Sequence, residues 1–171
     1  MSLLNRRTLL LALPLVAAAC GFTPVYAPGG TGSALHGRIA VQAPEEITGA
    51  TGTDAYFLVQ NLEQRLGRGG SPDYRLDLTL STQEEGQAIT AGNEITRYSV
   101  IGTVNYSLTR LSAGNIVSSG TVRNFTGYSA TGSTVETLAG ERDAHERLMV
   151  ILADQITTQI LATADLSAPA E

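Results

Sequence analysis

Hydrophobic and polar residues alternate along four stretches of the chain, which is the pattern of strands that bury one face. The stretch Leu35–Ala43 is the first, and Pro44 ends it. The cleanest alternation runs over 74–81, and the stretches 95–110 and 116–128 continue it, the last more weakly. The turn residues Ser112-Ala113-Gly114-Asn115 separate the last two stretches and predict a hairpin.

Two further stretches carry apolar residues at every third or fourth position, which predicts amphipathic helices. The first helix is expected over Thr53–Arg68, with Thr53 as its N-cap. The second is expected to open at a capping box formed by Ser133 and Glu136 and to run to about Thr163.

The predicted order of elements is therefore β-α-β-β-β-α. Short turns join the last three strands, so we expect these to pair antiparallel. The first strand is joined to them through a helix, and a right-handed crossover then places it parallel to its neighbour. Two amphipathic helices on one face of a four-stranded, mostly antiparallel sheet make an α+β two-layer sandwich.

The first 19 residues are expected to be an export signal that takes no part in the fold. Arg6 and Arg7 form a basic start, and the apolar run Leu9–Ala19 follows. A membrane-spanning helix needs about 20 apolar residues, so this run is too short to span. The small residues directly before Cys20 indicate that its thiol accepts a lipid. The alternative is an ordinary cleaved signal that happens to contain a cysteine.

The stretch Ala17-Ala18-Ala19-Cys20-Gly21 resembles a bacterial lipobox. In such a motif the cysteine carries acyl chains and becomes the new N-terminus. Gly21 in place of Asp resembles lipoproteins that are sent on to the outer membrane. The only cofactor-like group that we expect is therefore the covalent lipid on Cys20, and several acyl chains make a stable anchor.

The rest of the chain divides into three parts. Residues 20–33 are rich in Pro and Gly and are expected to form a flexible tether. Residues 34–164 form the α+β domain, and residues 165–171 are expected to be a disordered tail. The tether and the loops Gln83–Glu94 and Ser129–Ser133 are candidate contact elements.

Composition narrows the class of protein. The 171 residues suffice for one domain, and 43% of them are hydrophobic. A net charge of −5 argues against a nucleic-acid partner, because such binding needs clustered basic charge. A single cysteine excludes a disulfide framework within the chain and any cysteine-rich metal cluster.

Three arginines stand at the polar positions of the strands, on the sheet face that the helices leave uncovered. Arg75, Arg97 and Arg123 could hold an anionic group such as a phosphate through forked hydrogen bonds. The alternative is a solvated face on which Arg75 pairs with Asp77. The weak alternation of the last strand leaves the side of Arg123 open.

Catalytic chemistry has little support in the sequence. His145-Glu146 begins like a zinc-protease helix motif, but the position of the second histidine is Met149. No nucleophile elbow and no phosphate-binding loop with lysine is present. The sequence therefore predicts no catalytic residue, no metal ligand and no enzyme.

The stretch Cys20-Gly21-Phe22-Thr23-Pro24-Val25-Tyr26 resembles the Cys-Gly-Phe-x-Pro-Leu-Tyr start of mature LptE, the lipopolysaccharide-assembly lipoprotein, as found in alphaproteobacteria. The similarity continues through the β-α-β-β-β-α order. It includes the strand segment Tyr98–Tyr106 and the stretch Val122-Arg123-Asn124-Phe125 before a long C-terminal helix. The resemblance covers nearly the whole mature chain.

The resemblance implies a non-enzymatic protein of the Gram-negative outer membrane, on its periplasmic side. LptE proteins fill the lumen of the LptD β-barrel as plug and assembly partner, and together they place lipopolysaccharide in the outer leaflet. That ligand carries phosphates, so Arg75, Arg97 and Arg123 are candidate contacts to it or to the barrel. The loop and helix start that carry basic residues in distant relatives here read Ala91-Gly92-Asn93 and Ala139-Gly140-Glu141, so only the lipidated Cys20 is carried over.

Two other functions remain open at this stage. The chain could be a free-standing periplasmic lipoprotein that binds a small ligand or a lipid in an apolar pocket between helices and sheet. It could also be a structural lipoprotein of another envelope assembly machine, with the same anchor and acidity but a different partner.

Overall fold

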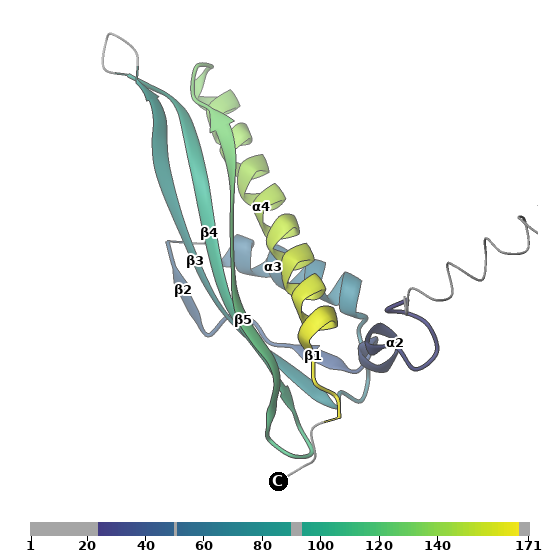
Figure 1. Ribbon diagram of the computed structural model, residues 1–171. Helices are drawn as coiled ribbons and strands as arrows, with labels where there is room; N and C mark the ends of the chain where they lie inside the picture. The colour runs from purple at the N-terminus through teal and green to yellow at the C-terminus, as the bar shows by residue number, and fades with distance from the viewer. Residues whose placement is uncertain (1–23, 50, 90–93, 168–171) are drawn as a thin grey trace, which may run out of the picture.

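The computed structural model describes residues 24–49, 51–89 and 94–167. A long, narrow three-stranded meander forms its body, and a long helix runs along the meander (Figure 1). The elements in chain order are α2 (Thr31–Leu35), β1 (Ile39–Val41), β2 (Glu46–Thr48), α3 (Gly52–Leu66), β3 (Tyr74–Ile89), β4 (Ile95–Arg110), β5 (Ile116–Ser129) and α4 (Thr134–Thr163).

The sheet is mixed, with the order β1-β3-β4-β5, and β2 also pairs with β3. The strands β3, β4 and β5 are antiparallel, whereas β1 is parallel to β3 and reaches it through α3. The two long helices, α3 and α4, pack on one side of this sheet. The predicted α+β two-layer sandwich is confirmed.

Within the described ranges, the sheet has five strands instead of the predicted four. The expected strand Leu35–Ala43 is reduced to β1, and the chain pairs with β3 a second time as β2. Pro44 stands between the two short strands and can donate no ladder hydrogen bond. The contact with β3 continues around it, because Gln42 and Glu45 donate backbone N–H bonds to β3.

The strand β3 is twice as long as its apolar alternation. Beyond Ser81 its helix-side positions become Thr82, Glu84 and Gly86, so the hydrophobic signal stops. Pairing with β4 nevertheless continues to Ile89. Most of the predicted contact loop Gln83–Glu94 is therefore strand, and residues 90–93 lie outside the described residues.

Capping boxes open both long helices. At α4 the predicted Ser133–Glu136 box is confirmed, with the Ser133 N–H donating to the Glu136 carboxylate at 2.7 Å. At α3 the cap is Thr51 and not Thr53: Asp54 receives the Thr51 N–H at 2.8 Å. A carboxylate at this position also suits the positive end of the helix.

The core lies between the sheet and the two helices. Side chains with no exposed surface meet there from every layer, among them Leu58, Leu62, Leu76, Leu108, Val100, Val104, Leu148, Leu152 and Ile156. Gly102 of β4 lets α4 approach closely, because a Cβ there would lie 2.8 Å from a Leu152 methyl.

The two ends of the domain are folded where the structure describes them. Within the predicted tether, Gly32 of α2 is buried and donates its N–H to the Val25 carbonyl. In the predicted tail, the Asp165 N–H donates to Val117 and the Leu166 carbonyl accepts from Arg110. Leu166 packs against the core, which holds this segment on the sheet.

The loop before β1 sits against the loop that follows α3. The Gly37 N–H donates to the Leu66 carbonyl at 2.7 Å. A Cβ on Gly69 would lie 1.7 Å from the Gly37 carbonyl oxygen, whereas a Cβ on the neighbouring Gly70 would meet nothing within 4 Å. The backbone approach at Gly69 therefore admits no side chain without a shift.

We expect Gly69→Ala to destabilise the domain by about 1–3 kcal/mol, because the added methyl must push two backbone segments apart. Gly70→Ala is the matched control and should stay within about 0.5 kcal/mol of wild type. Thermal and urea unfolding would measure both. Equal midpoints for the two variants would contradict the close approach at Gly69.

Candidate interaction surface

The sheet face away from the helices carries the polar positions of β3, β4 and β5. Across its centre the Asn105 amide donates to the Thr79 hydroxyl at 3.0 Å, and the Thr121 hydroxyl donates to the Asn105 carbonyl at 2.7 Å. This row joins the three strands, and no helix of the described residues covers it (Figure 1). The face therefore offers hydrogen-bonding groups across its middle.

The three predicted arginines all lie on this face, and the register settles the side of Arg123. Arg75 is opposite Thr109 of β4, Arg123 is opposite Thr103, and Arg97 is itself in β4. Neighbouring arginines are thus six residues apart along β4, which is about 20 Å at a rise of about 3.3 Å per residue. The structure does not bring them together into one anion site.

The arginines differ in their ion pairs. Arg75 lies 2.9 Å from the Asp77 carboxylate, which is the pairing that a solvated face predicts. In the described part of the chain, Arg97 and Arg123 have no ion-pair partner. These two guanidinium groups are therefore the better candidates to receive an anion.

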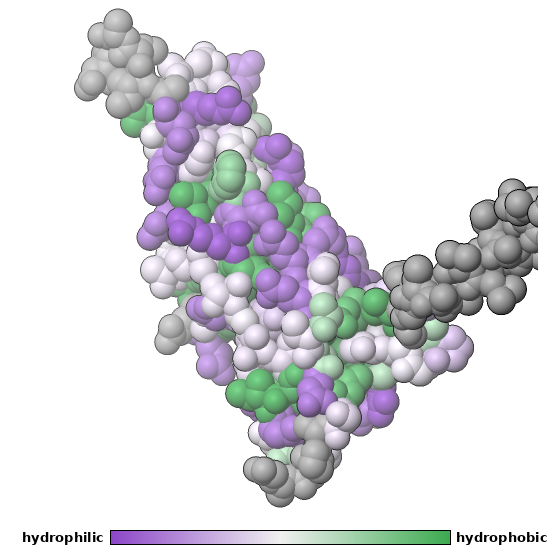
Figure 2. Space-filling view, in the orientation of Figure 1, coloured by the Kyte–Doolittle hydropathy of each residue, from purple (hydrophilic) through white to green (hydrophobic). Residues whose placement is uncertain are grey.

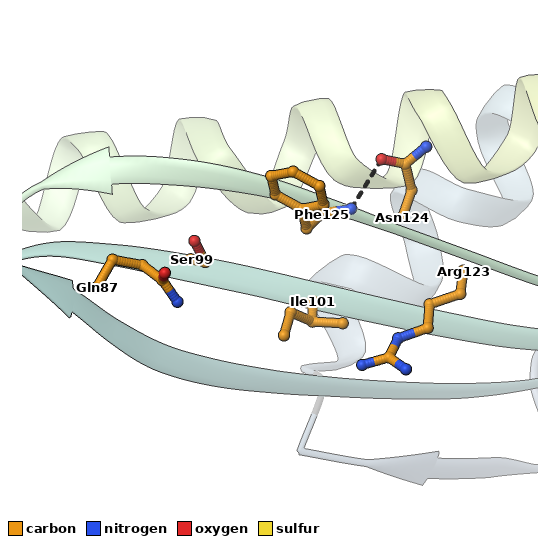
Figure 3. A pocket seen from close by; sticks show the side chains of 6 residues that line it. All are labelled: Gln87, Ser99, Ile101, Arg123, Asn124 and Phe125. Atoms are coloured by element: carbon orange, nitrogen blue, oxygen red, sulfur yellow. Dashed lines mark hydrogen bonds between the residues drawn. The ribbon is translucent and has the colours of Figure 1, made fainter.

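Arg123 borders a hollow of about 440 Å³ on the open face. Its guanidinium reaches across β4 towards β3, beside Ile101 (Figure 3). Phe125 is 66% exposed and is the cross-strand partner of Ile101. A cation next to an exposed aromatic ring suits a ligand that has both an anionic and an apolar part.

Arg97 borders a second hollow, near the end of the meander where β5 passes into α4. Thr131 from the predicted contact loop Ser129–Ser133 lines it, and the Ala130 N–H holds that loop to the Thr96 carbonyl at 2.9 Å. The predicted contact loop and one predicted arginine thus share a site.

A third hollow, of about 670 Å³, lies between the start of α3, α4 and the outer half of β3. His145 stands in it, with Nδ1 3.1 Å from Asp54 and Nε2 3.5 Å from Glu84. Tyr128 also donates to Glu84, at 3.4 Å. The sequence did not predict this cluster, although Glu141 and His145 share one helix face at a spacing of four.

The protonation of this cluster is set by burial and hydrogen bonds. Burial alone would raise the pKa of Asp54, but hydrogen bonds from His145 and Thr51 hold that pKa below its ordinary value. The hydrogen bond to Asp54 raises the pKa of His145 against the effect of burial. Burial and the nearby carboxylate of Glu84 raise the pKa of Tyr128 to about 12.

The remaining surface is mixed. Figure 2 shows hydrophobic residues in small separate groups among hydrophilic ones on the side of the molecule turned to the viewer. Of the helices in the described residues, none is long and apolar enough to cross a membrane. Cys20, the predicted lipid acceptor, lies outside the described residues.

Comparison with known proteins gives a family and a fold. The family described as LptE, lipopolysaccharide-assembly, matches residues 38–160. No curated protein matches the chain.

Several solved structures share the fold. A candidate lipoprotein from Caulobacter crescentus CB15 is 23% identical, with a TM-score of 0.59 over 77% of this chain and 92% of that one. Rare lipoprotein B from Shewanella oneidensis is 12% identical, with a TM-score of 0.54 over 73% and 94%. Lipoprotein B from Nitrosomonas europaea is 12% identical, with a TM-score of 0.51 over 75% and 89%. At these identities the likeness concerns the fold alone.

Proposed function

The chain belongs to the LptE family of lipopolysaccharide-assembly proteins, and on this basis we propose that it is the partner and plug of an LptD-like outer-membrane β-barrel. In this proposal the lipid on Cys20 anchors it to the outer membrane on the periplasmic side. The domain helps the barrel to assemble and helps to deliver lipopolysaccharide to the outer leaflet. Its role is binding and not catalysis.

The observation that carries the proposal is the extent of the family match. Residues 38–160 begin just before β1 and end three residues short of the end of α4. The match therefore includes α3, nearly all of α4 and the whole sheet, which supports a role in lipopolysaccharide assembly for the domain as a whole.

The open sheet face supports a plug role. Barrel interiors are polar, so a domain enclosed there needs hydrogen-bonding groups on its surface. The Thr79–Asn105–Thr121 row supplies such groups across the middle of the face. The narrow outline of the domain also suits a tubular lumen (Figure 1).

The hollow at Arg123 supports direct contact with lipopolysaccharide. Lipid A carries both phosphates and acyl chains. A guanidinium without an ion-pair partner among the described residues can fork two hydrogen bonds to a phosphate. Ile101 and the exposed Phe125 then offer apolar surface at the same place.

The alternative of a free-standing ligand-binding lipoprotein has less support. It requires an apolar pocket between the helices and the sheet. Leu58, Leu148 and Leu152 fill that space and have no exposed surface. The hollows at Arg123, Arg97 and His145 are open to the outside instead.

Affinity purification of the tagged, lipidated protein from detergent-solubilised outer membrane tests the partnership. We expect one large β-barrel at a ratio near one to one after stringent washing, identified by mass spectrometry. A clean monomer, or the components of another envelope machine, would contradict the plug role.

Arg123→Ala should weaken binding of lipopolysaccharide about tenfold, because a hydrogen-bonded charge contact is worth roughly 1.5 kcal/mol or more. Arg75→Ala removes an arginine from the same face, but one that Asp77 already neutralises, and should change binding less than twofold. Binding to immobilised lipopolysaccharide would measure both. Equal losses would indicate general charge attraction instead of a site at Arg123.

Cys20→Ser should abolish membrane anchoring but leave partial function, because a plug is also held by the barrel around it. Membrane fractionation and sensitivity of the cells to large antibiotics would measure the two effects. Complete loss of function, with normal export and folding, would mean that the barrel contact is too weak to act without the lipid.

A further inference from the structure

A group of metal-binding side chains gathers in the third hollow, away from the open sheet face. Glu84 comes from β3, and Glu141 and His145 come from α4. One donor atom from each lies within 4.8 Å of the other two. Glu84 is far in sequence from the Glu141–His145 pair, and the packing of α4 along the meander brings it to them.

The spacing of these donors is close to that of a metal site. The ligand atoms of four-coordinate zinc lie about 3.3 Å apart, because each bond is about 2.0–2.1 Å long. Glu84 Oε1 and His145 Nε2 are 3.5 Å apart. Glu141 stands one helical turn before His145, and its flexible side chain needs to move by at most about 1.5 Å to bring its donor atom from within 4.8 Å to this spacing.

A buried carboxylate fixes the orientation of the imidazole. Asp54 is 3% exposed and holds His145 Nδ1 with one oxygen. Its other oxygen accepts the Thr51 N–H at the cap of α3, so Asp54 is itself held in place. His145 therefore presents Nε2 to Glu84, and a carboxylate behind a histidine is the usual second contact of metal-ligating histidines.

The charge of the hollow also favours a cation. Four carboxylates and one guanidinium line it, which leaves −3 with His145 neutral and −2 with His145 protonated. The carboxylates are those of Asp54, Glu84, Glu141 and Glu146, and the guanidinium is that of Arg142. A single proton on the imidazole leaves a charge of −2, whereas a divalent cation beside the neutral imidazole leaves −1.

We propose that Glu84, Glu141 and His145 bind a divalent transition-metal ion of the zinc class, with Asp54 as the positioning residue. An imidazole nitrogen among the donors favours zinc over magnesium or calcium, which prefer all-oxygen sites. Three protein ligands leave one position for water. The open hollow gives a hydrated ion access to the site.

Bound metal would tie the outer half of β3 to α4. This part of the meander extends past the last large apolar residue on the helix side of β3, so hydrophobic packing holds it less firmly there. The site is independent of the proposed partnership with a barrel, and each can fail without the other.

Zinc titration of the full-length, lipidated protein in detergent tests the site. The protein carries no polyhistidine tag and is first stripped with a chelator. We expect one Zn²⁺ per chain by calorimetry and by native mass spectrometry, together with a higher midpoint of thermal unfolding. Co²⁺ in place of Zn²⁺ should give the visible absorption of a four-coordinate ion.

Glu141→Gln and His145→Gln should each weaken Zn²⁺ binding at least tenfold. Glu141→Gln keeps the shape of a half-buried side chain, so it should fold even if His145→Gln does not. His36→Gln removes the other histidine, which is exposed, and should leave affinity unchanged. No stoichiometric binding, or equal affinities for Glu141→Gln, His36→Gln and wild type, would overturn the proposal and leave His145 as an ion-paired imidazolium only.

Discussion

Burial of one face of the sheet beneath α3 and α4 is the interaction on which the rest of this structure depends. The apolar positions of β3, β4 and β5 have only one layer to pack against, and the two helices supply it. Successive side chains of a strand point to opposite faces of the sheet. When the helices cover one face, every second side chain therefore lies on the opposite, uncovered face. This alternation gives the small domain an uncovered polar sheet face.

The same packing makes two chemically different surfaces. On the open face, Arg123 stands beside Phe125 and Ile101, a combination suited to an amphiphilic anion. On the helix side, α4 brings His145 against β3 and the cap of α3, where acidic groups gather. One surface attracts anions and the other cations, although the chain as a whole is acidic. The net negative charge of the chain does not indicate the anion-attracting surface at Arg123.

The candidate sites show which features of a site can be predicted from sequence alone. The alternation along the strands placed Arg75 and Arg97 on one face but left the side of Arg123 open, and the pairing of Arg123 with Thr103 puts it on the same face. The alternation gives the face of a residue but not its position relative to residues of other strands. The separation of the three arginines therefore became visible only from the pairing register of the strands. The cluster at His145 needed more, because Glu84 and Glu141 meet only when α4 lies along the meander.

The sequence by itself determined the class of the fold, the two helices and their sides and the parallel first strand, because periodicity and capping act over neighbouring residues. The family resemblance came from the motif Cys20–Tyr26 instead. Only the tertiary structure decided the fifth strand and the length of β3. Beyond Ser81 the hydrophobic alternation ends, yet backbone hydrogen bonds to β4 continue the strand without it. Backbone hydrogen bonds between distant segments do not depend on a periodic pattern of side chains. For that reason the length of β3 cannot be predicted from hydrophobic alternation and is known only from the structure.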